Sequence, residues 1–161
     1  MGREATKSKS NVYYNARIAA ANYNEKLKSR EGASEMLGIH PSTLAGYELG
    51  TVKCPNPDMI VIMADLYNAP ELMNYFCARE CPIGCDRVEK LEVEDLDRIT
   101  IKTLSTLKGV ENIKDALIEI TADGVITEDE KGKLEDIMKQ LQKITKVAGE
   151  LKIWVKKNLE V

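Results

Sequence analysis

The chain has 161 residues, of which 43% are hydrophobic and 30% charged, and it contains only one Phe and one Trp. This length suits a small domain with an appendage, and the ordinary composition excludes a disordered chain. No apolar run approaches the roughly 18 residues that span a bilayer, so we expect a cytoplasmic protein without a membrane segment.

Charge is distributed unevenly along the chain. Residues 1–55 carry eight basic and five acidic side chains, net +3, so the remaining residues carry −6 of the total net charge of −3. One part of the protein can therefore approach phosphate groups while the other part stays away from them, although +3 gives only a weak field.

Residues 1–11 are polar and rich in Lys and Ser, and we expect a flexible arm there. Apolar side chains at helical spacing then predict a first helix over residues 11–22.

Residues that typically start and end helices follow in the segment from Ser29 to Gly50. Ser29 suits an N-cap and Gly38 a helix terminator, so a second helix is expected between them. Pro41 favours the first turn of a third helix, which Gly50 closes. Two short helices separated by a turn at Gly38 predict a helix-turn-helix.

Two further helices are predicted over residues 58–67 and 70–77 from their apolar spacing. Five short helices with short connections make a compact all-α domain, which we place at residues 12–77. A linker over residues 78–92 follows, because Pro82 interrupts the apolar pattern.

Three of the four cysteines lie at or near this linker. Cys77, Cys81 and Cys85 follow the spacing C-x3-C-x3-C, and Cys54 precedes them. Zinc sites usually contain two C-x2-C to C-x4-C pairs, and a fourth ligand would have to come from Cys54 or from His40, the only histidine. We therefore expect free thiols, with no metal and no other cofactor, and we leave open a metal or redox function.

Residues 93–161 show a seven-residue repeat of apolar side chains. The repeat continues in register across Gly109, which predicts one long helix over residues 96–120. A break and a capping box formed by Thr127 and Glu130 precede a second long helix. Two long helices joined by a short turn predict an antiparallel hairpin.

A single hairpin buries only one seam, so we predict that two hairpins associate as a four-helix bundle and make the protein a homodimer. The predicted dimerisation residues are Leu134, Ile137, Leu141, Ile144, Leu151, Trp154 and Val155. The apolar residues expected partly outside the seam are Leu104, Leu107, Ile118, Met138, Val147, Ile153 and Trp154. The alternative is that these residues pack on the first domain of the same chain.

The segment Ser-Arg-x-x-Ala-Ser-x-x-Leu-Gly-Ile-x-x-Ser-Thr-Leu-x-x-Tyr-Glu-x-Gly, residues 29–50, resembles the helix-turn-helix of the lambda-repressor and Cro type, also called the XRE family. The resemblance extends over about residues 11–76 and implies a five-helix domain that binds duplex DNA. Residues 72–84 and the hairpin are similar to a group of such proteins from Gram-positive bacteria and their mobile elements.

The family holds a phosphate at the N-terminus of its second helix and contacts base edges with the start of its third helix. The resemblance assigns base contacts to His40, Pro41, Ser42, Thr43 and Gly46. We expect phosphate contacts from Arg30, Lys53 and Arg17. Arg, Gln and Asn are absent from the base-contact positions, so direct readout should be modest and DNA shape should contribute.

These features predict a transcriptional regulator that binds double-stranded DNA sequence-specifically as a dimer. No Ser/His/Asp set, Cys/His set or phosphate-binding Gly loop occurs, so we do not expect an enzyme. The alternative is a protein-interaction module, an adaptor or antitoxin-like protein that uses a helix-turn-helix fold with little DNA binding.

Overall fold

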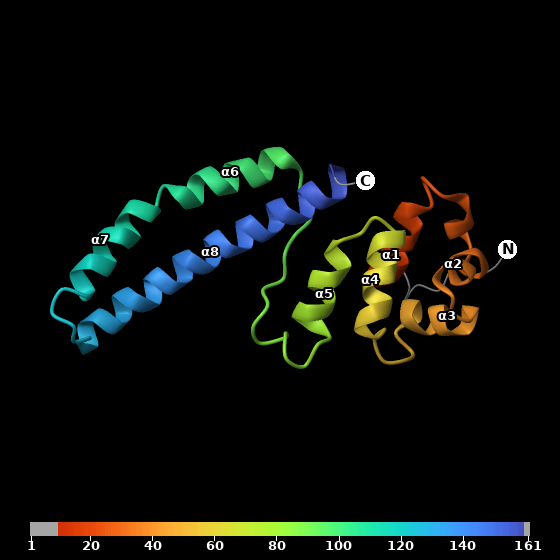
Figure 1. The fold of residues 1–161 in the computed structure, drawn as a ribbon, viewed down its shortest axis with the longest axis horizontal. Helices are drawn as coiled ribbons and strands as arrows, with labels where there is room; N and C mark the ends of the chain where they lie inside the picture. Colours follow the sequence, from red (N-terminus) through yellow and green to blue (C-terminus); the bar gives the residue numbers. More distant parts are fainter. Residues whose placement is uncertain (1–9, 160–161) are drawn as a thin grey trace. The chain divides into compact units, whose positions relative to one another are not determined.

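The computed structural model describes residues 10–159, and all regular secondary structure within them is helical (Figure 1). The predicted all-α fold is confirmed. The chain divides into two compact units, of which the first ends at Lys90 and the second begins at Leu91. The predicted arm lies almost entirely outside the described residues. Among the residues that are described, no helix is long and apolar enough to cross a bilayer.

The first unit is a cluster of short helices. Its elements are α1 (Val12–Ala20), the 3-10 helix η2 (Glu25–Lys28), α2 (Arg30–Leu37), α3 (Pro41–Leu49), α4 (Pro57–Leu66) and α5 (Glu71–Arg79). The five predicted helices are present, and η2 is an additional short helix between α1 and α2. The most deeply buried apolar side chains are Leu27, Leu44, Ile60, Met63 and Leu72. These residues come from η2, α3, α4 and α5, and Tyr13 of α1 and Leu37 of α2 belong to the same core.

Helix caps in the sequence define the boundaries of α2 and α3. Ser29 Oγ accepts a hydrogen bond from the Gly32 amide at 3.0 Å, which confirms the predicted N-cap of α2. Gly38 ends α2 and Gly50 ends α3, as predicted. Both have a left-handed backbone, with φ of +68° and +64°, which an L side chain rarely adopts. The two glycines therefore fix the turn between the helices and the start of the loop after α3.

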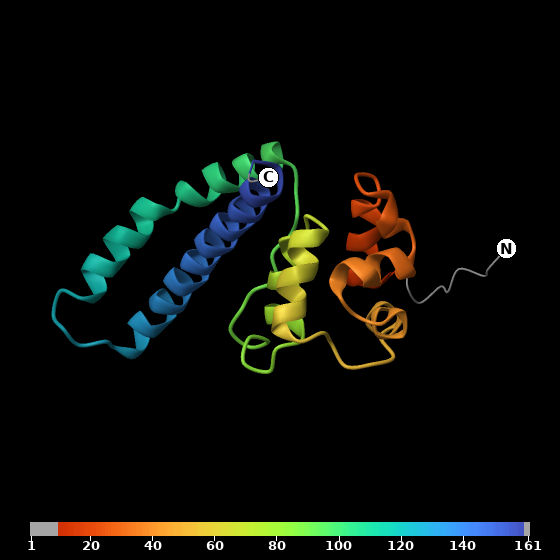
Figure 2. The ribbon, with the colours of Figure 1, turned by 45° about the vertical axis from the view of Figure 1, so that its right-hand side comes forward.

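The second unit is a helical hairpin. It contains α6 (Leu96–Leu107), α7 (Val110–Ile120) and α8 (Glu128–Asn158). α8 lies beside both α6 and α7 (Figures 1 and 2). The predicted capping box is present at the start of α8, where the Glu130 carboxylate accepts a hydrogen bond from the Thr127 amide at 2.8 Å.

The prediction of one unbroken helix over residues 96–120 is wrong, because the helix is interrupted between α6 and α7. The hydroxyls of Thr100, Thr103 and Thr106 donate to carbonyl oxygens four residues earlier at 2.7–2.8 Å, a pattern that bends helices. The Gly109 amide then bonds to the Thr106 carbonyl at 3.3 Å, which is the spacing of a 3-10 turn. The seven-residue spacing of apolar residues can continue across such an interruption. One irregular turn changes the direction of the helix axis but removes no apolar position.

The seam of the hairpin differs in part from the prediction. Ile113, Ile120 and Ile137 form a buried cluster. Val147 and Ile153, which the seven-residue repeat places outside the seam, are also buried, and that prediction is wrong. A strict seven-residue repeat drifts by about 20° per heptad around a straight α-helix. Different residues of the 31-residue helix α8 therefore reach the partner helices along its length.

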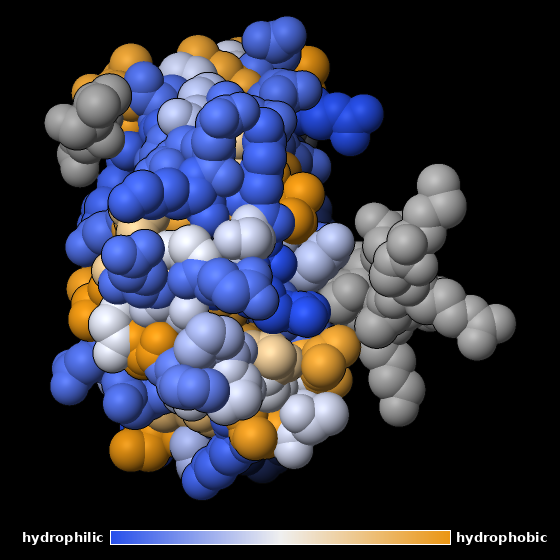
Figure 3. All heavy atoms as spheres, turned by 90° about the vertical axis from the view of Figure 1, so that its right-hand side faces the viewer, coloured by the Kyte–Doolittle hydropathy of each residue, from blue (hydrophilic) through white to orange (hydrophobic). Residues whose placement is uncertain are grey.

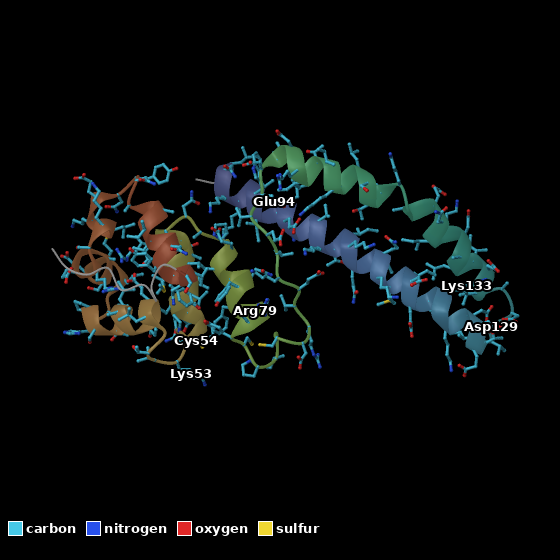
Figure 4. All side chains as sticks on the ribbon, turned by 180° about the vertical axis from the view of Figure 1, so that it is seen from behind. Lys53, Cys54, Arg79, Glu94, Asp129 and Lys133 are labelled. Atoms are coloured by element: carbon cyan, nitrogen blue, oxygen red, sulfur yellow. The ribbon has the colours of Figure 1, made fainter. Side chains whose placement is uncertain are left out.

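A polar cluster holds the segment before α6 against α8. Glu150 is 1% exposed, accepts a hydrogen bond from the Glu92 amide at 3.3 Å and lies 3.4 Å from Lys102 Nζ. Lys102 Nζ also lies 2.6 Å from the carboxylate of Glu94, which Figure 4 labels. The hydrogen bond with Glu94 raises the pKa of Lys102, so the lysine is charged at neutral pH and shares its positive charge between the carboxylates of Glu94 and Glu150.

Candidate nucleic-acid interface

The helices α2 and α3 form a helix-turn-helix in the first unit. The Ile39 amide donates to the Ser34 carbonyl at 3.0 Å and fixes the turn to α2. Buried Leu37 and Leu44 hold the two helices on the core. Figure 3 shows the side of the protein on which α2 and α3 lie, where the surface is mainly hydrophilic with separate hydrophobic patches. A polar ligand can therefore approach this side.

The first turn of α3 carries four of the five residues predicted to contact bases. His40 and Ser42 are exposed, and Pro41 and Thr43 are half-buried. His40 Nδ1 caps α3 by accepting a hydrogen bond from the Ser42 amide at 3.2 Å, and it lies 2.8 Å from Ser42 Oγ. Because Nδ1 accepts from the amide, it carries no proton, and we assign the Ser42 hydroxyl as the donor in the second contact. The free lone pairs of Ser42 Oγ can accept a hydrogen bond from the amino group of adenine or cytosine.

Gly46, the fifth predicted base contact, follows the same face of α3 but is covered by a side chain of the loop after the helix. It is buried, and a Cβ at this position would lie 2.7 Å from Cγ2 of Val52. Val52 belongs to the loop after α3 and is itself 50% exposed. The prediction that Gly46 faces the bases is therefore wrong, because Val52 covers that position.

Arg17 lies in the interior of the first unit. It is 2% exposed, its Nε donates to Glu48 Oε1 at 2.5 Å, and its Nη1 donates to the Leu27 carbonyl at 2.7 Å. Its guanidinium also lies 5.4 Å from the ring centroid of Tyr14. The prediction that Arg17 contacts phosphate is wrong, because burial and these partners keep its charge away from the surface.

Arg30 is the first residue of α2 and keeps part of its side chain in solvent. Its Nε donates to Glu48 Oε2 at 2.7 Å, and its side chain is 33% exposed. Glu48 is fully buried and also forms an ion pair with Arg17, so one carboxylate pairs with two guanidinium groups. The cluster carries a net positive charge, and Arg30 is its exposed member. A cation at a helix N-terminus provides a favourable site for a phosphate.

Lys53 is exposed in the loop between α3 and α4, next to Cys54 (Figure 4). Burial and the neighbouring carboxylate of Glu80 raise the pKa of the Cys54 thiol, so this cysteine is protonated and a poor nucleophile at neutral pH. All four cysteines are free thiols. Over residues 10–159, no group of three or more His, Cys, Asp or Glu side chains could hold a metal ion.

The predicted dimerisation residues divide into two sets. Ile137 belongs to the buried cluster of the hairpin, and Leu134 and Ile144 pack against that cluster. Assigning Ile137 to a dimer contact is therefore wrong, because it is only 5% exposed within the hairpin itself. A dimer contact stays a prediction for the other six residues, which are at least partly exposed: Leu134, Leu141, Ile144, Leu151, Trp154 and Val155. The apolar residues of α6, α7 and α8 that are more than half exposed are Ile101, Leu104, Leu107, Ile118 and Met138.

The fold and the exposed start of α3 define a helix-turn-helix domain. Residues 23–72, from before η2 to the first turn of α5, match the helix-turn-helix family. No curated protein and no solved structure matched the chain. The family match confirms the predicted helix-turn-helix of the lambda-repressor and Cro type, and it supports a DNA-binding regulator.

Two residues that shape this site were not predicted from the sequence. Glu48 follows Leu44 by four residues and so shares the inward face of α3, where a carboxylate needs a buried cation. Val52 is a branched apolar residue between Thr51 and Lys53, six residues after Gly46. The inward-facing carboxylate and the apolar loop residue can both be recognised in the sequence. The sequence does not show which residues they contact.

Proposed function

We propose that the protein is a cytoplasmic transcriptional regulator whose first domain, residues 12–77, binds double-stranded DNA sequence-specifically with α3 in the major groove. The proposal depends on the exposure of Ser42 at the start of α3 together with the partial exposure of Arg30 at the start of α2. The Ser42 hydroxyl can form a hydrogen bond with a base edge, and the Arg30 guanidinium can bind a phosphate. The family match of residues 23–72 supports the same function.

We propose further that the protein acts as a homodimer through its hairpin. The exposed apolar residues of α6, α7 and α8 would leave water if two hairpins packed as a four-helix bundle. Two-fold pairing would place two copies of α3 on a roughly palindromic site with half-sites about 34 Å apart.

Gel-shift titration of a random duplex DNA pool at two salt concentrations tests the DNA-binding proposal. We expect binding at low salt that weakens as salt increases, because phosphate contacts release counterions. Arg30→Ala should weaken binding to all sequences and reduce the salt slope by about one. Ser42→Ala and Thr43→Ala should change the sequence preference instead.

Lys114→Ala is the matched control, because Lys114 is an exposed lysine of α7 in the second unit. It should leave both the affinity and the salt slope unchanged. If no duplex in the pool is bound at low salt, the DNA-binding proposal is refuted.

A protein-interaction module, either an adaptor or an antitoxin-like protein, is the second candidate. It is favoured by the exposed apolar residues of the hairpin and by the absence of Arg, Gln and Asn from the first turn of α3. A monomeric protein that binds no DNA and co-purifies with another chain would establish this function. Light scattering is the first measurement to make.

A further inference from the structure

We infer that Val52 contacts the methyl group of a thymine in the major groove and replaces the side chain that α3 lacks at Gly46. The inference rests on the proposed DNA binding and adds to it a base-specific contact from outside α3.

Gly46 lies on the same face of α3 as the exposed residues of its first turn. Ser42 and Thr43 precede Gly46 by four and three residues, and this spacing brings helical residues side by side. Leu44 and Glu48 are fully buried on the inward face. A longer side chain at position 46 would therefore extend the surface that begins at Ser42.

The loop after α3 folds back onto this position. Gly50 reverses the chain with its left-handed backbone, and the Thr51 amide donates to the Gly46 carbonyl at 3.1 Å. Pro55 is buried and anchors the far end of the loop. The loop is thus attached to the last turn of α3, and Val52 comes directly after the attachment.

The side chain of Val52 occupies the space above Gly46. Its Cγ2 and Cγ1 atoms lie 2.7 Å and 3.1 Å from where a Cβ of residue 46 would be. Half of Val52 nevertheless remains exposed. One side of the isopropyl group therefore rests on the helix, and the other side faces outward as an apolar surface next to a polar first turn.

The chemistry of this surface selects one kind of base group. Valine can neither donate nor accept a hydrogen bond, so it cannot read the polar groups of a base edge. The thymine C5-methyl is the apolar group that standard base pairs present in the major groove. Lys53, the next residue, is exposed and can hold the loop near the DNA backbone.

Replacement of thymine by uracil tests the contact, because uracil pairs with adenine in the same way but lacks the methyl group. A duplex selected from random DNA by the wild-type protein is synthesised with uracil at each thymine in turn. We expect one position in each half-site at which uracil weakens binding about three- to fivefold, the effect of one buried methyl group.

Val52→Ala should remove this thymine preference at that position. The ratio compares two duplexes with the same protein preparation, so a change in the folded fraction cancels. Val61→Ala, at a valine of α4 that is 47% exposed, is the matched control and should leave the ratio unchanged. Thr43→Ser, which removes a methyl group from α3 and keeps the hydroxyl, should also leave it unchanged.

The outcomes separate this inference from the proposed function. A wild-type protein that retains no duplex refutes DNA binding and the Val52 contact together. If the protein binds DNA but no thymine responds to uracil, or if Val52→Ala keeps the full preference, only the Val52 contact is refuted. A preference that disappears in Thr43→Ser instead would assign the methyl contact to Thr43 and refute our assignment.

Discussion

The carboxylate of Glu48 connects three helices of the first unit at the scale of single residues. It is carried by α3, is 0% exposed, and accepts hydrogen bonds from Arg17 of α1 and Arg30 of α2. One carboxylate neutralises one guanidinium, so Arg30 keeps a positive charge at the surface. The same residue therefore contributes to stability and orients a side chain proposed to contact DNA.

Glu48→Gln should lower the free energy of unfolding of the first unit by about 3–5 kcal/mol, because buried Arg17 loses its counter-charge. Urea denaturation followed by circular dichroism measures the change. Glu35→Gln, at an exposed position of α2, is the control and should alter stability by less than about 0.5 kcal/mol. Equal effects of the two substitutions would show that the buried charge pair does not stabilise the domain.

The interruption between α6 and α7 is the main departure from regular structure at the scale of elements. Gly109 has φ of −86° and ψ of −7°, which any residue can adopt, and an added Cβ would meet only the Thr106 carbonyl oxygen at 3.6 Å. The geometry of position 109 therefore does not require glycine. The low helix propensity of glycine and the hydroxyl bonds of α6 together account for the break.

Gly109→Ala should raise the free energy of unfolding of the hairpin by about 0.5–1 kcal/mol, since alanine loses less backbone entropy than glycine. It should also increase the helical circular dichroism signal by joining α6 to α7. Gly132→Ala is the control, because Gly132 already lies within α8 and an added Cβ meets nothing within 4 Å. The control should gain similar stability with no added helix. A destabilised Gly109→Ala protein would mean that packing on α8 requires the break.

At the scale of the whole molecule, the hairpin leaves a large apolar surface in water. Ile101 is 68% exposed, Ile118 60% and Leu104 59%, while the cluster around Ile113 fills the space between α7 and α8. Association with a second copy through the hairpin, as proposed above, would remove these apolar side chains from water. A dimer would also hold two copies of α3 at a fixed separation, which compensates for the few base contacts that each copy can make.

The double substitution Leu104→Lys and Leu107→Lys should make the proposed homodimer a monomer, because it places two charges on the proposed contact surface. Multi-angle light scattering should show the molar mass falling to that of one chain. Both leucines are more than half exposed, so the hairpin itself should stay folded. Ile62→Lys, at an exposed residue of α4, is the control and should keep the dimer mass. A wild-type protein that is already monomeric would refute the dimer.

Much of the fold could be predicted from the sequence, because local interactions specify it. Ser29, Gly38 and Gly50 set helix boundaries through caps and backbone conformation, and Thr127 with Glu130 starts α8. The apolar spacing predicted the helices of both units, and the residue types at the start of α3 indicated the candidate site. These signals act over one helical turn, so they remain readable without a tertiary structure.

Only the tertiary structure decided which side chains of this site reach the surface. The sequence by itself determined a helix-turn-helix followed by long helices, but it placed Arg17 and Gly46 among the DNA contacts. The structure buries Arg17 against Glu48, 31 residues away, and covers Gly46 with Val52. Burial and charge pairing depend on residues far apart in the chain, and one sequence contains no record of which distant groups meet. The start of α3 was therefore predictable, whereas the partners of Glu48 and the position of Val52 were not.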